Sequence, residues 1–167
     1  LVAGGALAPG CPVDGRPIGP LAADATLFKL LPDGAGGALL LRGNRQTPGQ
    51  LGGIRSYCHR LHPDCLPVNG WPAGGVTLGS GASGIPAATM SGDGAAGAYV
   101  LFWEGIGPGL GLRAIHLLAD GSVAPGWDAG GVILSEAATS DFFDIATTGS
   151  AIAVWTDTRH PEGNVAY

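Results

Sequence analysis

Two cysteines and two histidines lie within one eight-residue stretch, Cys58-His59-Arg60-Leu61-His62-Pro63-Asp64-Cys65. Thiolate sulfur and imidazole nitrogen are ligands that zinc prefers, so a metal site is one interpretation of this stretch. On a β-strand, however, the side chains of Cys58 and His59 would point to opposite faces. The spacing also matches no common zinc module, and we therefore predict no metal ligands here.

Cysteine pairing is the competing interpretation of the same stretch. We expect a disulfide between Cys58 and Cys65, which requires an oxidising compartment. The chain has three cysteines, so one thiol remains if a single internal bridge forms. Cys11 is the expected spare, because Trp71 and Trp127 occupy the related position further along the chain. A Cys11–Cys65 bridge, an intermolecular bridge and free thiols stay open as alternatives.

Four tryptophans form a second group with chemical potential, because an aromatic face can stack on a ligand such as a sugar. They are Trp71, Trp103, Trp127 and Trp155. Their recurrence at related positions favours packing within or between sheets, since each buried aromatic ring removes a large apolar area from water. Ligand stacking by these four residues stays the alternative.

The acidic residues give no clear catalytic set. A glycosidase built as a β-propeller needs carboxylates that converge on its axis, and the candidates are Asp93, Glu104, Asp141, Asp144 and Asp157. Aspartate in a turn commonly bonds to the turn itself. The sequence has no G-x-S-x-G nucleophile elbow and no D-x-D-x-D-G calcium loop. We predict no catalytic residue and no cofactor; whether the protein is an enzyme stays open, with a non-catalytic role favoured.

A glycine-rich stretch, Gly92–Gly97, fits the pattern G-x-G-x-x-G. A dinucleotide site needs a helix directly after that pattern, whereas the apolar run Ala98–Trp103 follows here. We interpret the glycines as a tight β-hairpin turn. The same strand–turn–strand pattern occurs at Thr26–Leu41 and Phe142–Trp155, so the sequence predicts three such hairpins.

The three hairpins belong to three tandem repeats, which we place at residues 1–60, 61–116 and 117–167. A period of this length with about four short strands per unit is typical of a β-propeller blade. The predicted fold is all-β, with three four-stranded blade-like repeats that form one domain or a fragment of a larger propeller. Three blades are too few to close a ring. We therefore expect the chain to belong to a longer polypeptide or to associate with further copies of itself.

Composition agrees with many short strands and excludes some functions. The 31 glycines and 13 prolines fall between apolar runs, as tight turns between strands require. With 13% charged residues, a net charge of −5 and no basic stripe, nucleic acid is not an expected partner. No uninterrupted apolar run is long enough for a membrane span. The share of glycine and alanine, with few lysines, indicates a secreted bacterial protein.

Parts of the repeat resemble one that is common in secreted bacterial β-propeller proteins, roughly D-G-x-G-G-A-hydrophobic-W-x-D-x-R. Asp33–Ala38 resembles its first part, Trp155–Arg159 its second, and Leu118–Trp127 the portion after the gap. The first copy departs by placing Gly43 where the second has Trp103. The resemblance implies a non-catalytic, secreted or cell-surface module for protein interaction or assembly. A carbohydrate-binding or glycan-active propeller is the alternative that it leaves open.

Overall fold

The protein is all-β in the part of the chain that the structure, a computed structural model, describes. The described residues are 6–19, 25–45, 53–79, 84–85, 87–105, 110–136, 138–157, 159 and 165–166, with the backbone alone at 27, 138–141 and 165–166. They form eleven strands in antiparallel sheets and contain no helix. The all-β prediction is confirmed. Within these residues there is no helix that could cross a membrane.

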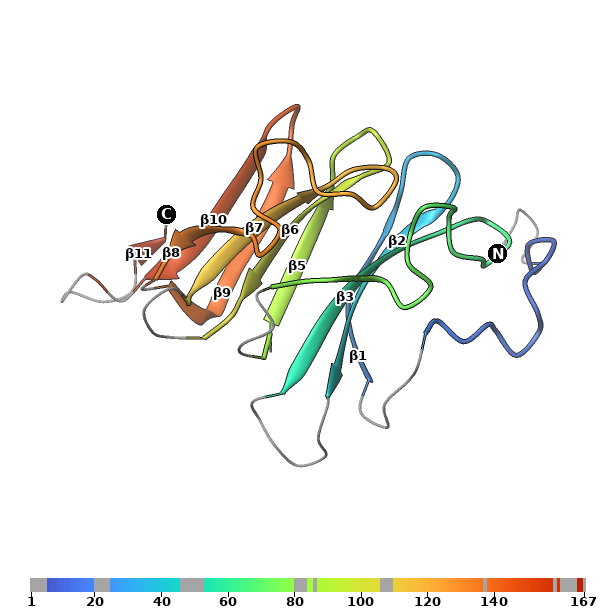
Figure 1. The fold of residues 1–167 in the computed structure, drawn as a ribbon, viewed down its shortest axis with the longest axis horizontal. Coiled ribbons are helices and arrows are strands. Elements are labelled where there is room, and N and C mark those ends of the chain that lie inside the picture. Colours follow the sequence, from blue (N-terminus) through green and yellow to red (C-terminus); the bar gives the residue numbers. More distant parts are fainter. Residues whose placement is uncertain are drawn as a thin grey trace.

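Three sheets follow one another along the chain (Figure 1). The first sheet contains β1 (Ala25–Pro32), β2 (Ala38–Arg45), β3 (Ile54–Leu61) and β4 (Val76–Thr77). The second contains β5 (Ala87–Gly92), β6 (Ala98–Trp103), β7 (Leu112–Leu117) and β8 (Val132–Ser135). The third contains β9 (Ala138–Thr147), β10 (Ala151–Asp157) and β11 (Val165–Ala166). In every sheet, strands that are consecutive in the chain are hydrogen-bonded neighbours.

The three predicted hairpins correspond to β1–β2, β5–β6 and β9–β10. The glycine stretch Gly92–Gly97 turns the chain between two paired strands, as predicted, and no helix follows it. The repeat boundaries after residues 60 and 116 stay a prediction. The first two sheets each take strands from both sides of one boundary, since β4 pairs with β3 and β8 pairs with β7.

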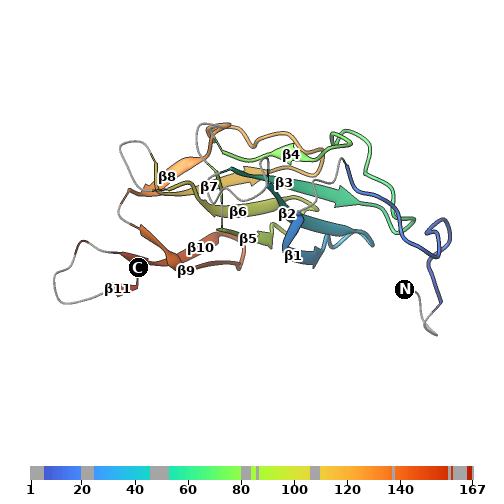
Figure 2. The same ribbon diagram turned by 90° about the horizontal axis from the view of Figure 1, so that it is seen from below.

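The middle sheet is covered on both faces (Figure 2). Its first strand, β5, contacts the first strands of the other two sheets, β1 and β9. Two adjacent residues of β6 show the consequence, because Leu101 and Phe102 point to opposite faces and both are fully buried. This explains why the run Ala98–Trp103 is apolar at nearly every position. The described strands do not close into a barrel or a ring.

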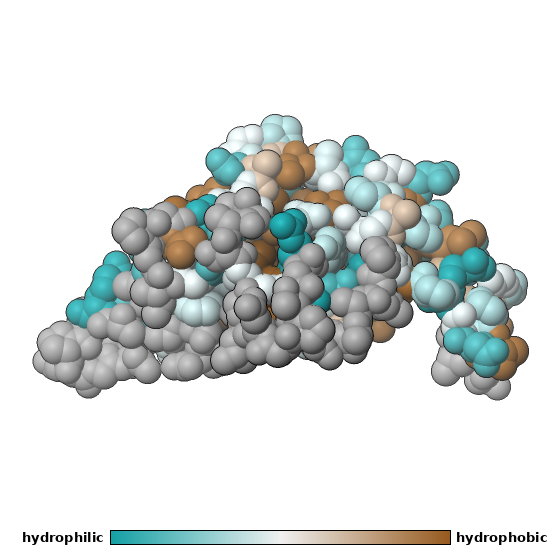
Figure 3. Space-filling model, turned by 60° about the horizontal axis from the view of Figure 1, so that its bottom comes forward, coloured by the Kyte–Doolittle hydropathy of each residue, from teal (hydrophilic) through white to brown (hydrophobic). Residues whose placement is uncertain are grey.

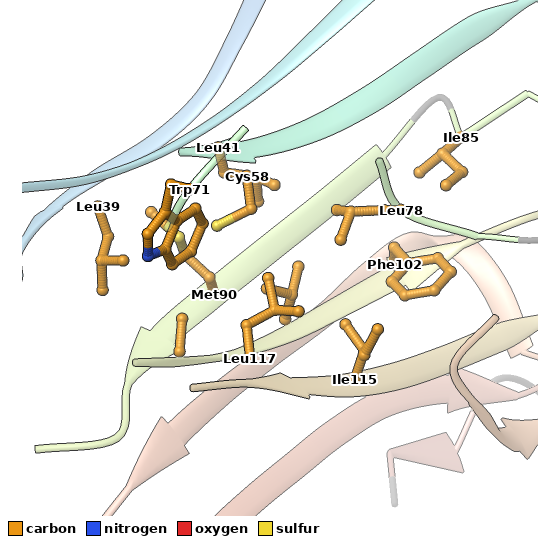
Figure 4. Close-up of a cluster of buried hydrophobic side chains, with 12 residues drawn as sticks. Leu39, Leu41, Cys58, Trp71, Leu78, Ile85, Met90, Phe102, Ile115 and Leu117 are labelled. Carbon is orange, nitrogen blue, oxygen red and sulfur yellow. The ribbon is translucent and has the colours of Figure 1, made fainter. Parts of the chain in front are cut away.

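The larger core lies between the first and second sheets (Figure 4). Leu39, Leu41 and Cys58 from the first sheet face Met90 and Phe102 from the second. A smaller core lies between the second and third sheets, and its buried members are Leu101, Leu112, Ala114 and Ile145.

An aspartate, buried in the first hairpin and half-buried in the second, holds the turn of each of the first two hairpins. One carboxylate oxygen of Asp93 accepts hydrogen bonds from the backbone N–H groups of Ala95, at 2.7 Å, and Gly97, at 2.8 Å. Its other oxygen lies 2.9 Å from the His116 ring nitrogen Nε2. Burial raises the pKa of Asp93, but the bonds from His116, Ala95 and Gly97 outweigh it and hold the pKa below its ordinary value. Asp33 makes the matching backbone bonds in the first hairpin.

We predict that Gly97→Ala destabilises the protein because the turn leaves no room for a Cβ atom. A Cβ at residue 97 would collide with the backbone carbonyl oxygen of Leu117 and with the Asp93 carboxylate. Overpacking of this kind typically costs about 1–3 kcal/mol, and the free energy of unfolding in urea should fall by that amount. Gly92→Ala is the control, because its Cβ would come no closer than 4.0 Å to any atom. Equal effects of the two substitutions would contradict this account of the turn.

Candidate functional site

The disulfide joins Cys11 to Cys65, with a Cα–Cα distance of 5.4 Å, and Cys58 is free. The predicted Cys58–Cys65 pairing is therefore wrong, and the Cys11–Cys65 alternative is confirmed. The reason lies in β3, which carries the Cys58 side chain into the core between two sheets, while Cys65 follows in the next turn (Figure 4). Burial raises the pKa of the Cys58 thiol to about 12, so this residue is a protonated member of the core.

The disulfide joins the N-terminal segment to the first sheet. At the corresponding place between the first and second sheets, the structure has a tryptophan, Trp71. The Trp71 ring packs on Gly121, where an added Cβ would lie 3.1 Å from the indole. The indole N–H donates a 2.9 Å hydrogen bond to the Ala119 carbonyl in the same turn. Cys65 and Gly121 hold the same place in their turns, each with a positive φ, 68° and 84° respectively. Cys11 and Trp71 therefore have the same structural role. Cys11 joins the N-terminal segment to the turn after β3, and Trp71 joins the loop between β3 and β4 to the turn after β7.

The four tryptophans lie where packing alone explains them. Trp71 is buried in the core between the first two sheets. Trp103, Trp127 and Trp155 pack together against the core between the second and third sheets. The structure thus supports the packing interpretation of these residues. It does not gather the four around one common site, and ligand stacking stays untested.

The two most buried carboxylates have arginine partners. Glu104 lies 2.8 Å from the guanidinium of Arg113 and is fully buried. Asp157 lies 2.7 Å from Arg159 and accepts a hydrogen bond from the Ser135 hydroxyl. The Arg159 hydrogen bonds hold the pKa of Asp157 far below its ordinary value against the opposing effect of burial. Both groups are engaged in the structure rather than directed at a ligand.

Polar side chains link the first strands of all three sheets. The Lys29 ammonium donates to the Thr89 hydroxyl at 3.1 Å, and that hydroxyl donates to the Asp144 carboxylate at 3.1 Å. Asp144 is the exposed candidate carboxylate with a described side chain, whereas the side chain of Asp141 lies outside the described residues. Among the described residues, no three His, Cys, Asp or Glu side chains are placed to hold a metal ion.

The third sheet exposes apolar side chains on its outer face. Ile152 is 57% exposed and Val154 is 37% exposed. They are the second and fourth residues of β10, whereas the second and fourth residues of β2, Leu39 and Leu41, are fully buried against the second sheet. The first sheet packs against the second sheet through one face, and the corresponding face of the third sheet is exposed.

The first sheet is incompletely covered on its opposite face. Leu30 of β1 is 59% exposed there, and residues 16–18 of the N-terminal segment line an open depression together with Leu40 and Arg42 of β2. On the face drawn in Figure 3, hydrophobic side chains of the described residues lie among hydrophilic ones. The strand β8 also exposes three consecutive apolar residues, Val132, Ile133 and Leu134. The two end faces are the candidate interaction surfaces of the protein.

Comparison of the chain with protein-family models, with curated proteins and with solved structures found no match.

We predict that the tryptophan–glycine pair can replace the disulfide. Removing the bridge with Cys11→Ala and Cys65→Ala should lower the free energy of unfolding by about 2–4 kcal/mol, as loss of a disulfide typically does. Installing the pair of the next interface, with Cys11→Trp and Cys65→Gly, should recover at least about 1 kcal/mol through burial of the ring.

Urea denaturation without reductant gives the free energy of unfolding of the wild type, the Ala/Ala variant and the Trp/Gly variant. Thiol titration of the unfolded, unreduced wild type is the control and should detect one reactive group, Cys58. A Trp/Gly variant no more stable than the Ala/Ala variant would show that the two interfaces are not equivalent.

Proposed function

We propose that the protein is a non-catalytic, extracellular assembly module of the β-propeller type. Its two end sheets would pack head to tail, the third sheet of one copy against the first sheet of the next. Contacts of this kind join two different surfaces, so they build rings when the rotation closes and open filaments when it does not.

The exposed outer face of the third sheet carries this proposal. Ile152 and Val154 occupy the positions at which Leu39 and Leu41 bury themselves against a neighbouring sheet. Fully burying an exposed side chain of this size is worth about 1.5–3 kcal/mol, and covering these partly exposed side chains would contribute a share of that. Large exposed apolar patches are also rare on monomeric soluble proteins, and they commonly mark a site where a partner binds. A following sheet of the same type would bury these residues as the second sheet buries those of β2.

Two further observations fit this proposal. The Cys11–Cys65 disulfide suits an oxidising, extracellular location. A carbohydrate-binding propeller, the alternative function, would draw support from tryptophans and carboxylates around one channel. The described tryptophans instead pack between sheets, and Glu104 and Asp157 pair with arginines.

We predict that charges on the outer face of the third sheet abolish self-association. The wild type should sediment as species larger than a monomer, in proportions that depend on concentration, and Ile152→Asp with Val154→Asp should sediment as a folded monomer. The matched control is Ile133→Asp with Val132→Asp, because these two side chains are also exposed but lie on β8 of the middle sheet. Circular dichroism checks that each variant folds. A monomeric wild type, or dissociation by both pairs alike, would refute head-to-tail assembly.

A further inference from the structure

The N-terminal segment has the same turns as the loop that leads into β4. Each residue in the range 10–19 corresponds to the residue 60 positions later, in the range 70–79. The Gly15 N–H donates to the Pro12 carbonyl at 3.0 Å, and the Gly75 N–H donates to the Pro72 carbonyl at 2.8 Å. Positive φ angles recur at three matching pairs of glycines, with 88° and 94° at Gly10 and Gly70, 76° and 87° at Gly15 and Gly75, and 71° and 77° at Gly19 and Gly79. The two segments therefore follow the same backbone path.

The second of these segments ends in an outer strand. Directly after Gly75, β4 pairs antiparallel with β3 and places Thr77 opposite Tyr57. The Leu78 N–H then donates to the Ser56 carbonyl at 2.9 Å, and the Leu78 side chain is buried in the core between the first two sheets. In the next repeat, β8 pairs antiparallel with β7. In both cases the segment supplies the fourth strand of the sheet before it.

Residues 16–18 of the N-terminal segment hold the place of β4 but pair with no described strand. Ile18 corresponds to Leu78, and Pro17 corresponds to Thr77. Peptide groups alternate in direction along an antiparallel strand. Because the Leu78 N–H points towards β3, the Thr77 N–H points away from it. Proline is tolerated at such a position of an edge strand, so Pro17 is compatible with strand pairing through Ile18.

In the described structure, no sheet covers the face of the first sheet beside this segment. Leu30 and Leu40 lie opposite each other on β1 and β2, as Met90 and Val100 do on β5 and β6. Met90 and Val100 are fully buried in the core shared with the first sheet, whereas Leu30 is 59% exposed. Two open depressions lie on this face, one lined by residues 16–18 and Leu40 and the other by Leu30 and the turn after β3. The segment and this face therefore leave a place for one more sheet of the same kind.

The third strand of the third sheet, β11, corresponds in register to β3. Asp157 of β10 pairs with Val165, and Asn44, at the same position of β2, pairs with the residue before Ser56. Ala166 therefore corresponds to Ser56, whose carbonyl accepts the hydrogen bond from the end of β4. The other edge of β11 pairs with no described strand. Figures 1 and 2 place β11 and the N-terminal segment at opposite ends of the molecule, so the two cannot meet within one chain.

We propose that the N-terminal segment of one copy adds to β11 of a second copy, as the fourth strand of the third sheet of that copy. Ile18 would lie opposite Ala166, and its N–H would donate to the Ala166 carbonyl as that of Leu78 donates to Ser56. This interaction rests on the proposed head-to-tail assembly and adds to it a strand pairing with a defined register.

Oxidative crosslinking between two full-length variants, Ile18→Cys and Ala166→Cys, tests the register. Residues that share a hydrogen-bonded pair of antiparallel strands have Cα atoms about 5.5 Å apart, within the range of about 4.4–6.8 Å that a disulfide spans. Mild oxidation of the mixture should therefore give a covalent dimer in which mass spectrometry finds residue 18 joined to residue 166. Val165→Cys in place of Ala166→Cys is the matched control. It lies one residue out of register and should give at least about fivefold less of the dimer.

A proline at residue 18 tests the strand pairing without a crosslink. Ile18→Pro removes the N–H that would be donated to β11, so the dissociation constant of the assembly, measured by sedimentation, should rise at least about fivefold. Val13→Pro is the control, because Val13 is 86% exposed and is the second residue of the turn that the Gly15 N–H closes. Proline is favoured at that turn position, so this variant should assemble like the wild type. Circular dichroism checks that both variants fold.

Two results would overturn the strand pairing while leaving the assembly proposal intact. The first is an assembly that gives equal crosslinking at residues 165 and 166, or none at either. The second is an assembly that Ile18→Pro weakens no more than Val13→Pro does. A wild type that sediments as a monomer would instead refute head-to-tail assembly itself, and the strand pairing with it.

Discussion

The structure depends on one constraint, which is that each sheet has two apolar faces and both must be kept from water. The middle sheet meets this requirement fully, since Leu101 and Phe102 are buried on opposite faces by its neighbours. An isolated four-stranded sheet of this composition would leave both of those faces in water and lose the stabilisation that their burial provides. The sheets are therefore not separate domains joined by linkers. The first sheet packs against the second and the second against the third, so neighbouring sheets in the chain share a core.

Two different bonds reinforce this packing at equivalent places. Trp71 fastens the edge of the first sheet to the turn of the second through its ring and its indole N–H. The disulfide does the same for the N-terminal segment, through a covalent bond between Cys11 and Cys65 in the turn after β3.

The sequence allowed the strands and turns to be predicted well, because their signals are local. Apolar runs separated by glycine turns predicted β1–β2 and β5–β6 correctly, and the alternation of side chains on a strand argued against a metal site at Cys58 and His59. The disulfide was predicted incorrectly because nearness in sequence was given more weight than register. Aligning Gly10-Cys11 with Gly70-Trp71, and Asp64-Cys65 with Asp120-Gly121, would have identified the pair. The burial of Arg42 beside His59 could not be predicted, since it depends on which strands and turns pack around β2.

The loop between the third and fourth strands of the first sheet touches the elements on both sides of it, through Cys65 to the segment before and through Trp71 to the sheet after. Stability in such a linear array is a sum over neighbours, and within the described structure the middle sheet has a neighbouring sheet on each face, whereas the first and third sheets each have one. Amide hydrogens of β10, which exposes Ile152 and Val154, should therefore exchange faster than those of β6, where Leu101 and Phe102 are fully buried.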